Sequence, residues 1–307
     1  MTPKIFVDGE HGTTGLQILQ RLEGRTDIEL ISLAHEDRRD LDARRDMLRE
    51  ADFAILCLPD EASRESVVLA EGAGTRFIDA STAHRTDPDW VFGFAELNSG
   101  HGDVIAQAEK VANPGCYSTG AIALLRPLRL AGLLPADAFV SINAVSGYTG
   151  GGKSLIADME SGAISAPHFT YAHGLTHKHL PEITAHAKLD RQPIFTPAVG
   201  KFPQGMIVNV PLHMDQLSAS SRAEVHEVLA DFYAGSDQVL VSALEASDAL
   251  PRLDAEAMAD SDAMEIHVFG NDRQVNLAAV LDNLGKGASG ACVRSLDLML
   301  SDHQRRA

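Results

Sequence analysis

The chain has 307 residues, of which 45% are hydrophobic and 22% charged, and its formal net charge is −17. These proportions are typical of globular proteins, and the length predicts two domains. The negative charge argues against nucleic acid and anionic membranes as partners, because both require basic patches.

The three cysteines, Cys57, Cys116 and Cys292, are too few and too scattered for a disulfide framework or a zinc site. The N-terminus lacks the basic and apolar segments of a signal peptide, and no apolar run reaches the roughly 18 residues that span a bilayer. We therefore expect a cytoplasmic protein without a bound metal.

The first third of the chain alternates short apolar strands with helices. Four strands are predicted, at Lys4–Asp8, Ile28–Leu33, Asp52–Leu58 and Arg76–Ala80. Helical spacing of apolar residues follows the first strand, at Leu16–Leu22, and the third, at Ser63–Ala70. This alternation is typical of an α/β fold with a Rossmann-like, doubly wound parallel sheet.

The pattern changes after Cys116, where strands become longer and helices fewer, as in an α+β domain. A last helical stretch, Lys286–Leu300, is apolar on one side. We expect residues 1–117 with about 284–307 to form one domain and residues 118–283 the other. An exposed, mobile loop is expected over Leu244–Asp262. The remaining predicted elements are helices at Ser118–Leu130 and Ala219–Tyr233 and strands at Phe139–Val145, Ile194–Phe195, Met206–Leu212 and Met264–Phe269.

Three glycines, Gly9, Gly12 and Gly15, lie between the first strand and the first helix. Glycine permits a tight turn and lets the backbone approach a pyrophosphate, which the free amides of the helix N-terminus attract. Thr13 and Thr14 add hydroxyl donors. The motif predicts a dinucleotide site, although its spacing differs from G-x-G-x-x-G and an ordinary glycine-rich turn is the alternative.

The end of the second strand indicates the type of dinucleotide. An acidic residue there binds the ribose 2′-hydroxyl of NAD, whereas a nearby arginine accommodates the 2′-phosphate of NADP. Ser32 ends this strand, and Arg38 and Arg39 follow. Glu36 and Asp37 could serve an NAD ribose or be solvated loop charges. The arginines favour NADP(H).

Cys116 follows a Pro114-Gly115 turn and directly precedes an apolar helix. A helix N-terminus stabilises a thiolate and lowers the pKa of the thiol below its free value of about 8.5. Cys116 is therefore a candidate nucleophile. Cys57 and Cys292 lie in apolar segments and are expected to be buried structural cysteines.

A short motif, His177-x-His179-x-x-Glu182, supplies groups that could act as acid and base near neutral pH. Metal binding and helix capping are the alternatives. Two basic residues could hold an anionic substrate, namely Arg85 after the fourth strand and Lys153 after the glycine-rich segment Ser146–Gly152. A plain surface charge is the alternative for each.

Together these segments resemble N-acetyl-γ-glutamyl-phosphate reductases of the shorter form, within the aspartate-semialdehyde dehydrogenase-like group. The resemblance covers nearly the whole chain, with the motifs in family order. At the start of the chain, His11 stands where the family commonly has a smaller residue. The matching segments are residues 6–17, 79–85, 113–117, 146–153, 177–182 and 282–291.

The resemblance implies reduction of N-acetyl-glutamyl 5-phosphate to N-acetyl-glutamate 5-semialdehyde in arginine biosynthesis. The Cys116 thiolate would displace phosphate to form a thioester, which NADPH would reduce. His179 is the preferred acid and base, and His177 the reserve. Glu182 would orient this pair or bind substrate.

The resemblance also implies roles for the remaining motif residues. Arg85 would hold the leaving phosphate, with Lys153 second, and Ser146 and Gly147 belong to the substrate-binding glycine-rich loop. Asn283, Lys286 and Gly287 would contact the cofactor. The second domain would carry substrate binding and the contacts of a homodimer or homotetramer.

Three other functions stay open from the sequence. The first is the same chemistry on another acyl phosphate, as in aspartate-semialdehyde dehydrogenase. The second is a non-catalytic NADPH sensor, which would not need a cysteine at a helix N-terminus. The third is a metal-dependent hydrolase that uses the two histidines.

Overall fold

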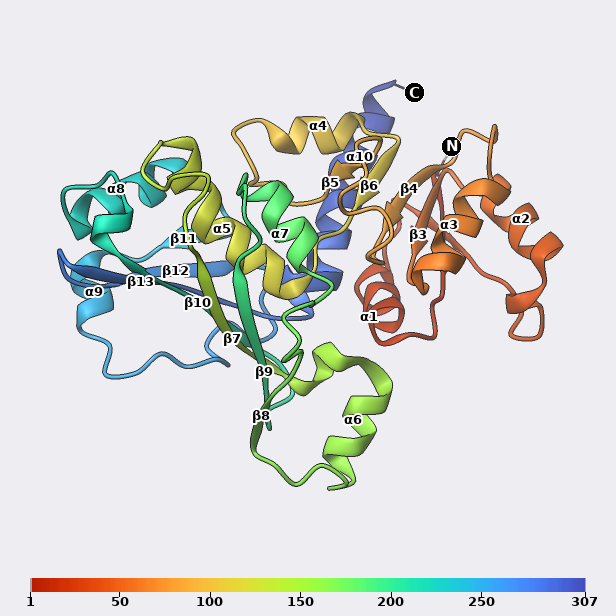
Figure 1. The fold of residues 1–307 in the computed structure, drawn as a ribbon. Coiled ribbons are helices and arrows are strands. Elements are labelled where there is room, and N and C mark those ends of the chain that lie inside the picture. Colours follow the sequence, from red (N-terminus) through yellow and green to blue (C-terminus); the bar gives the residue numbers. More distant parts are fainter. Residues whose placement is uncertain (1, 307) are drawn as a thin grey trace. The chain divides into compact units, whose positions relative to one another are not determined.

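The computed structural model describes residues 2–306, and its contacts divide the chain into two compact units (Figure 1). The first unit comprises Met1–Ala95, Gly100–Pro114 and Ala288–Ala307, and the second comprises Glu96–Ser99 and Gly115–Gly287. Residues 115–117 and 284–287, which we expected in the first domain, therefore belong to the second. Cys116 thus lies in the same unit as the two histidines of the motif.

Six strands in the described part of the first unit form a parallel sheet in the order β2-β1-β3-β4-β6-β5. This confirms the predicted doubly wound sheet. The strand predicted at Ile28–Leu33 is only three residues long, because β2 lies at the edge and pairs with β1 alone. The strands are β1 (Lys4–Asp8), β2 (Glu29–Ile31), β3 (Phe53–Leu56), β4 (Arg76–Asp79), β5 (Val91–Phe92) and β6 (Lys110–Ala112).

Helices cover both faces of this sheet. One face carries α1 (Thr13–Leu22), α4 (His101–Gln107) and α10 (Gly290–Arg306), and the other carries α2 (Leu41–Glu50) and α3 (Asp60–Leu69). The sequence did not predict α2 or α4. Most residues of α2 are polar, and only Arg44 and Leu48 of this helix are buried. The sequence of α2 therefore shows little apolar periodicity.

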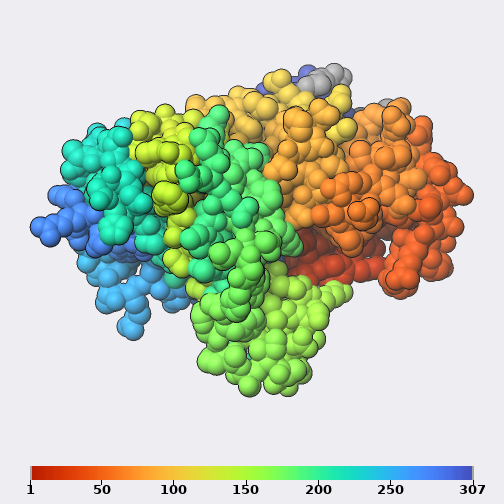
Figure 2. All heavy atoms as spheres, viewed as in Figure 1, coloured from red at the N-terminus to blue at the C-terminus, as the bar shows by residue number. Residues whose placement is uncertain are grey.

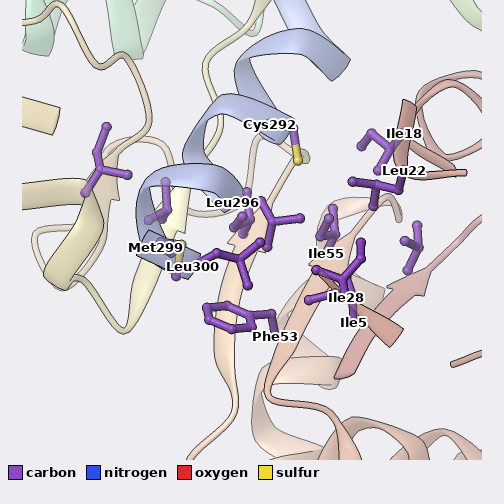
Figure 3. Close-up of a cluster of buried hydrophobic side chains, with 14 of the residues drawn as sticks. Ile5, Ile18, Leu22, Ile28, Phe53, Ile55, Cys292, Leu296, Met299 and Leu300 are labelled. Atoms are coloured by element: carbon purple, nitrogen blue, oxygen red, sulfur yellow. The ribbon is translucent and has the colours of Figure 1, made fainter. Parts of the chain in front are cut away.

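The core of the first unit joins its N-terminal and C-terminal segments. Figure 3 shows Cys292, Leu296 and Met299 of α10 packed beside Phe53 and Ile5 of the sheet. The expected burial of Cys292 is confirmed, and burial raises the pKa of its thiol. The helix predicted at Lys286–Leu300 is confirmed as α10, which returns the chain to the first unit.

Seven strands in the described part of the second unit form a mixed sheet in the order β11-β12-β13-β10-β7-β9-β8. The expected second, α+β domain is confirmed. The sequence did not predict β13, a buried inner strand that pairs with both β10 and β12. The strands are β7 (Ser141–Gly147), β8 (His168–Thr170), β9 (Ile194–Gly200), β10 (Met206–His213), β11 (Val239–Val241), β12 (Met264–Gly270) and β13 (Gln274–Leu281).

The central helix of the second unit is α5 (Cys116–Leu130), which is buried along most of its length against β10 and β13. Gly120 permits this packing, because an added β-carbon would lie 3.1 Å from Cβ of Val208. Beside α5 lie α7 (Leu180–His186) and α8 (Arg222–Phe232). This arrangement fixes the half-buried Cys116 at the start of a buried helix.

Two predicted segments of the second unit differ from the structure. Ser146–Gly152 is not one loop, because Ser146 and Gly147 end β7 and Gly152 begins α6 (Gly152–Glu160). The segment that contains α6 projects from the rest of this unit (Figure 2). The region expected as an exposed loop begins with α9 (Leu244–Asp248), whose Ser247 is buried and bonded to His267. Within residues 2–306, no helix is long and apolar enough to cross a membrane.

Candidate functional site

A cavity of about 450 Å³ lies in the first unit, at the carboxyl ends of β1 and β3. Its lining includes Gly9, Gly12, Arg38 and Arg39 from the predicted cofactor residues. Thr13, Thr14 and Gly15 form the first turn of the adjacent α1. Ser32 is exposed and is not part of the lining. His11, Leu33 and the segment Cys57–Pro59 also line the cavity, and the sequence patterns did not predict them as cofactor-binding residues.

Two glycines of the turn are required by close backbone contacts. Gly9 has φ +92°, and its added β-carbon would lie 2.4 Å from the carbonyl oxygen of Cys57. An added β-carbon on Gly15 would lie 2.5 Å from the carbonyl oxygen of Gly9. Cys57, which was expected to be buried in a strand, lies just beyond β3, is half-buried and lines the cavity. Desolvation, with Asp79 and Asp8 nearby, raises the pKa of its thiol to about 12, so it stays protonated at neutral pH.

The hydroxyl of Thr13 tests whether a phosphate-bearing cofactor fits here. Its Oγ1 is buried and makes no hydrogen bond within the described residues. A buried hydroxyl without a partner is costly, and a ligand oxygen would satisfy it. The helix N-terminus adds free amides that favour a phosphate. The glycine turn, the cavity and this hydroxyl therefore fit a dinucleotide.

At the carboxyl end of β4, Asp79 organises the segment that leads to Arg85. Its carboxylate accepts hydrogen bonds from Ser63, from Ser81 and from Nδ1 of His84 at 2.6 Å. Burial acts to raise the pKa of Asp79, but these hydrogen bonds outweigh it and hold the pKa below its usual 3.8. The ring of His84 is stacked on Trp90, with centroids 4.0 Å apart.

Arg85 is buried rather than presented on a surface. Its Nε donates to the carbonyl oxygen of Asn113 at 2.9 Å, and its Nη2 donates to that of Ala80 at 3.3 Å. Asn113 opens the turn that leads to Cys116. Arg85 therefore holds the backbone at Asn113 and Ala80. The sequence predicted only a contact between Arg85 and a phosphate.

Cys116 is the first residue of α5, and the helix begins after Gly115. The amide of Gly115 donates to Oε2 of Glu182 at 3.2 Å, and this carboxylate is almost fully buried. Cys116 lines a second cavity of about 380 Å³ together with Ser146, Gly147 and His177. The predicted nucleophile, the end of β7 and one motif histidine therefore share one cavity.

The two histidines of the motif have different surroundings. Nδ1 of His177 accepts the backbone N–H of His179 at 3.1 Å, and Nε2 of His177 lies 3.3 Å from the hydroxyl of Tyr171. His179 is 5% exposed, and its Nε2 lies 4.0 Å from Oε1 of Glu182. The ring of Tyr117 contacts both histidines at centroid distances of 6.0 Å. Glu182 thus lies near His179 and accepts a hydrogen bond from the backbone beside Cys116.

Two tyrosines that the sequence analysis missed border the second cavity. Burial raises the pKa of Tyr171 to about 12, and burial also raises the pKa of Tyr117. Both hydroxyls are therefore protonated at neutral pH. Tyr117 donates to the carbonyl oxygen of Ala198 at 2.8 Å. The tyrosine directly after the nucleophile was visible in the sequence, but its fixed orientation was not.

The basic residue that lines this cavity is Lys178, between the two histidines. Lys153 lies on α6, is exposed, and is not part of the lining. The sequence favoured Lys153 because of its glycine-rich neighbours. It could have indicated Lys178 through its place inside the histidine motif.

The segment 283–287, expected to contact the cofactor, is tightly held within the second unit. Asn283 accepts the N–H of Gly205 at 2.9 Å and donates to Thr149 at 3.0 Å. Lys286 is 3% exposed, and its Nζ lies 2.7 Å from Oε2 of Glu96 and 2.9 Å from Oε1 of Gln238. These contacts occupy groups that we expected to face the cofactor, so their contact with it stays a prediction.

Gly287 lies against the nucleophile. An added β-carbon would come 2.7 Å from Cβ of Cys116 and 3.0 Å from the carbonyl oxygen of Asp282. Gly287 lies in a π-helical turn, Gly285–Ser289, and such turns occur frequently at functional sites. In the described chain, no group of three or more His, Cys, Asp or Glu side chains could hold a metal ion.

Two family models match the chain. The model described as semialdehyde dehydrogenase, NAD binding domain, matches residues 4–105, and the model described as semialdehyde dehydrogenase, dimerisation domain, matches residues 116–283. Among curated proteins, the chain is 61% identical over 308 residues to N-acetyl-gamma-glutamyl-phosphate reductase of Brucella suis, covering 98% of this chain and 99% of that protein. The Brucella melitensis biotype 1 protein of the same name is 60% identical, with the same coverage.

Solved structures share the fold at low identity. Aspartate semialdehyde dehydrogenase II of Vibrio cholerae, complexed with ASA, is 17% identical with a TM-score of 0.74, covering 99% of each chain. Aspartate semialdehyde dehydrogenase with NADP from Candida albicans is 13% identical with a TM-score of 0.68, also covering 99% of each chain. Both similarities extend over the two units.

Proposed function

Because this chain belongs to the N-acetyl-γ-glutamyl-phosphate reductase family, we propose that it reduces N-acetyl-glutamyl 5-phosphate to N-acetyl-glutamate 5-semialdehyde with NADPH, in arginine biosynthesis. The observation that carries this proposal is the 61% identity to the Brucella suis reductase over 98% of the chain. Similarity to aspartate semialdehyde dehydrogenases at 13–17% identity supports the fold and gives no argument for their substrate. Family membership also argues against a sensor and a metal-dependent hydrolase.

The first unit supplies the NADPH site. Gly9, Gly12 and Gly15 let a pyrophosphate approach the N-terminus of α1, and Thr13 offers a hydroxyl that has no hydrogen-bond partner among residues 2–306. Arg38 and Arg39 line the cavity where the 2′-phosphate of NADP is expected. When bound, NADPH supplies the hydride that reduces the acyl carbon.

Cys116 performs the first step as a nucleophile. Its thiolate is stabilised by the free amides at the start of α5, a helix of 15 residues. The sulfur attacks the γ-carbonyl carbon, a C–S bond forms, and the C–O bond to phosphate breaks. Inorganic phosphate leaves with the bonding electrons, and a thioester remains on Cys116. After reduction at this carbon, the C–S bond breaks and the thiolate returns.

His179 and Glu182 form the acid and base pair of this mechanism. A base that is oriented by a carboxylate is the usual arrangement for activating a nucleophile. His179 takes the proton of the Cys116 thiol and later donates it to the oxygen of the reduced intermediate. It takes this proton back as the C–S bond breaks, so that the aldehyde leaves, and then returns it to the sulfur. Glu182 orients His179 and holds the amide of Gly115, which positions Cys116.

His177 and its neighbours hold the substrate in the cavity of Cys116. His177 and Tyr171 are linked at 3.3 Å, and both line the cavity with Ser146 and Gly147. Lys178 is the cation in the lining that suits an anionic group of the substrate. Arg85 stays a candidate for the leaving phosphate and Lys153 a weaker one, since Arg85 already holds backbone and Lys153 is exposed.

Self-association and location complete the proposal. The model of a dimerisation domain that matches residues 116–283 supports a homodimer or homotetramer formed through the second unit. We place the protein in the cytoplasm, where amino-acid biosynthesis supplies the activated acid and uses the aldehyde.

The reaction in reverse tests this function, because the aldehyde is more stable than the acyl phosphate. Purified protein would be given NADP, inorganic phosphate and N-acetylglutamate semialdehyde, with and without Cys116→Ala. NADPH formation that requires both phosphate and Cys116 is expected. Turnover with aspartate semialdehyde instead would keep the mechanism and overturn the substrate. No turnover with either aldehyde would overturn the function.

A further inference from the structure

Two histidines form a group with an arginine of the nucleotide cavity. Nε2 of His11 lies 3.2 Å from Nδ1 of His35, and Nη1 of Arg38 lies 3.3 Å from the same Nδ1. The two imidazole centroids are 5.0 Å apart. His11 and Arg38 line the cavity, and His35 connects them from the segment after β2. The three side chains therefore form one continuous group.

The hydrogen bonds of this group determine where its protons lie. Guanidinium groups only donate, so Nδ1 of His35 accepts from Arg38 and carries no proton. Nε2 of His11 lies within hydrogen-bond distance of the same atom, and its role depends on the tautomer of the pair. A proton on Nδ1 of His35 would turn this atom from an acceptor into a donor, which could then point to a ligand in the cavity.

The group lies where a doubly wound fold receives the 2′-phosphate of NADP. This phosphate is bound after the second strand, beside an arginine. β2 ends at Ile31, and Leu33, Arg38 and Arg39 of the next segment line the cavity with His11. Phosphate monoesters carry a second negative charge above a pKa of about 6, which is close to the pKa of about 6.5 of free imidazole.

Few other titratable groups near the two histidines could make NADP binding depend on pH. Oε1 of Glu10 lies 3.8 Å from Nε2 of His11, and it is the acidic side chain in contact with the pair. From β1, Asp8 is held by Arg44 and Ser66. From the end of β3, Cys57 is a thiol with its pKa raised to about 12. Glu36, Asp37 and Arg39 on the segment of His35 are exposed.

We propose that His11 and His35 are part of the site for the 2′-phosphate of NADP(H), and that NADP binding is coupled to proton uptake by this pair. The proposal rests on the function proposed above. A dianionic phosphate next to the pair stabilises an imidazolium, whose Nδ1–H or Nε2–H then donates to a phosphate oxygen. Affinity for NADP therefore falls as pH rises and the pair loses its proton. Affinity for NAD, which lacks this phosphate, does not change with these histidines.

Calorimetric titration of the full-length protein with NADP and with NAD tests the coupling. At pH 7, titrations in two buffers of different ionisation enthalpy give the number of protons taken up. Between pH 6.5 and 8.5, we expect the Kd of wild-type protein for NADP to rise about tenfold. His11→Asn combined with His35→Gln is expected to remove the proton uptake and flatten this pH dependence. His168→Asn replaces an exposed histidine on β8 and serves as the matched control.

Each alternative outcome is distinct. Equal proton uptake by wild type and the double variant, or an equal loss of affinity for NADP and NAD, would overturn the histidine proposal while leaving the reductase function intact. Wild-type protein that binds no NADP, yet is folded by circular dichroism, would overturn the cofactor assignment and this proposal together. A pH dependence lost equally in His168→Asn would also contradict the role of the pair.

Discussion

The backbone of Gly287 lies directly against Cys116, so that a β-carbon added to Gly287 would be 2.7 Å from Cβ of Cys116. The turn that contains Gly287 is itself fixed, because its amide donates to the carbonyl oxygen of Asp282 at 2.9 Å. A side chain at this position can be accommodated only if the cysteine or the turn moves. The start of α5 and the turn 285–289 therefore set the position of the nucleophile together.

Replacing Gly287 with alanine should displace Cys116. We expect kcat to fall by about 10- to 100-fold, because small misplacements of a reacting group carry costs of that size. Overpacking should lower the free energy of unfolding by about 1–3 kcal/mol. The measurements are steady-state kinetics and the rate of Cys116 alkylation by iodoacetamide. Gly102→Ala is the control, since its nearest contacts would be ordinary, at 3.8 Å. Unchanged kcat in Gly287→Ala would contradict this account.

Replacing Lys286 with methionine should destabilise the second unit rather than weaken cofactor binding. The change leaves the largely buried Glu96 without its cation, and breaking a fully buried ion pair costs about 3–5 kcal/mol, which is an upper value here. The double variant Lys286→Met with Glu96→Leu should recover much of this loss. Urea unfolding and NADP titration measure the two effects. A weaker affinity for NADP at unchanged stability would instead support the contact expected from the sequence.

Replacing each histidine by asparagine should separate their roles. His179→Asn should lower kcat by about 10²–10⁴-fold, because it removes the acid and base of the mechanism. His177→Asn should mainly raise KM, since His177 faces the cavity with Tyr171. Glu182→Gln should act like a milder His179→Asn and slow alkylation of Cys116. Glu160→Gln, an exposed glutamate at the end of α6, is the control. The reverse pattern would assign acid and base chemistry to His177.

Asp79 should make stability depend on acid pH. Its pKa in the folded protein lies below the ordinary 3.8, so its contribution is present above pH 3.8 and is lost as pH falls through the folded value. Asp79→Asn should lower the free energy of unfolding at pH 7 by about 3 kcal/mol, since it leaves its donors partly unsatisfied. The gap to wild type should narrow below pH 3.8. Asp46→Asn, an exposed substitution on α2, controls for net charge. A gap that stays constant with pH would contradict the pKa direction.

The fold was largely readable from local patterns, and the misses have identifiable causes. Continuous apolar runs gave β1, β3 and β4, because parallel strands are covered on both faces. Gln274–Leu281 was missed because its two central alanines favour no strand, and its pairing with β10 and β12 stabilises it instead. β5 is two residues long and carries almost no pattern.

The candidate site was less predictable where roles depend on long-range contacts. The Cys116 turn and the histidine motif are local signals, and the cavity brings Cys116 and His177 together. The burial of Arg85 and Lys286 against distant partners leaves no signal in their neighbours along the sequence. Lys178 and Tyr171 line the cavity only because of the path that the chain takes between β8 and α7.

The thioester on Cys116 is the central claim, and trapping it is the most direct test. The full-length protein would be mixed with N-acetyl-glutamyl 5-phosphate without NADPH. Released phosphate would be measured in solution, and acylation of the protein would be measured by intact-protein and peptide mass spectrometry. We predict a burst of one phosphate per active site above the spontaneous hydrolysis of the substrate, and an N-acetylglutamyl group on the Cys116 peptide. Both should be absent in Cys116→Ala. The mechanism would be contradicted by a burst of phosphate above spontaneous hydrolysis in Cys116→Ala. It would also be contradicted by wild-type protein that turns over the substrate with NADPH yet never carries the acyl group.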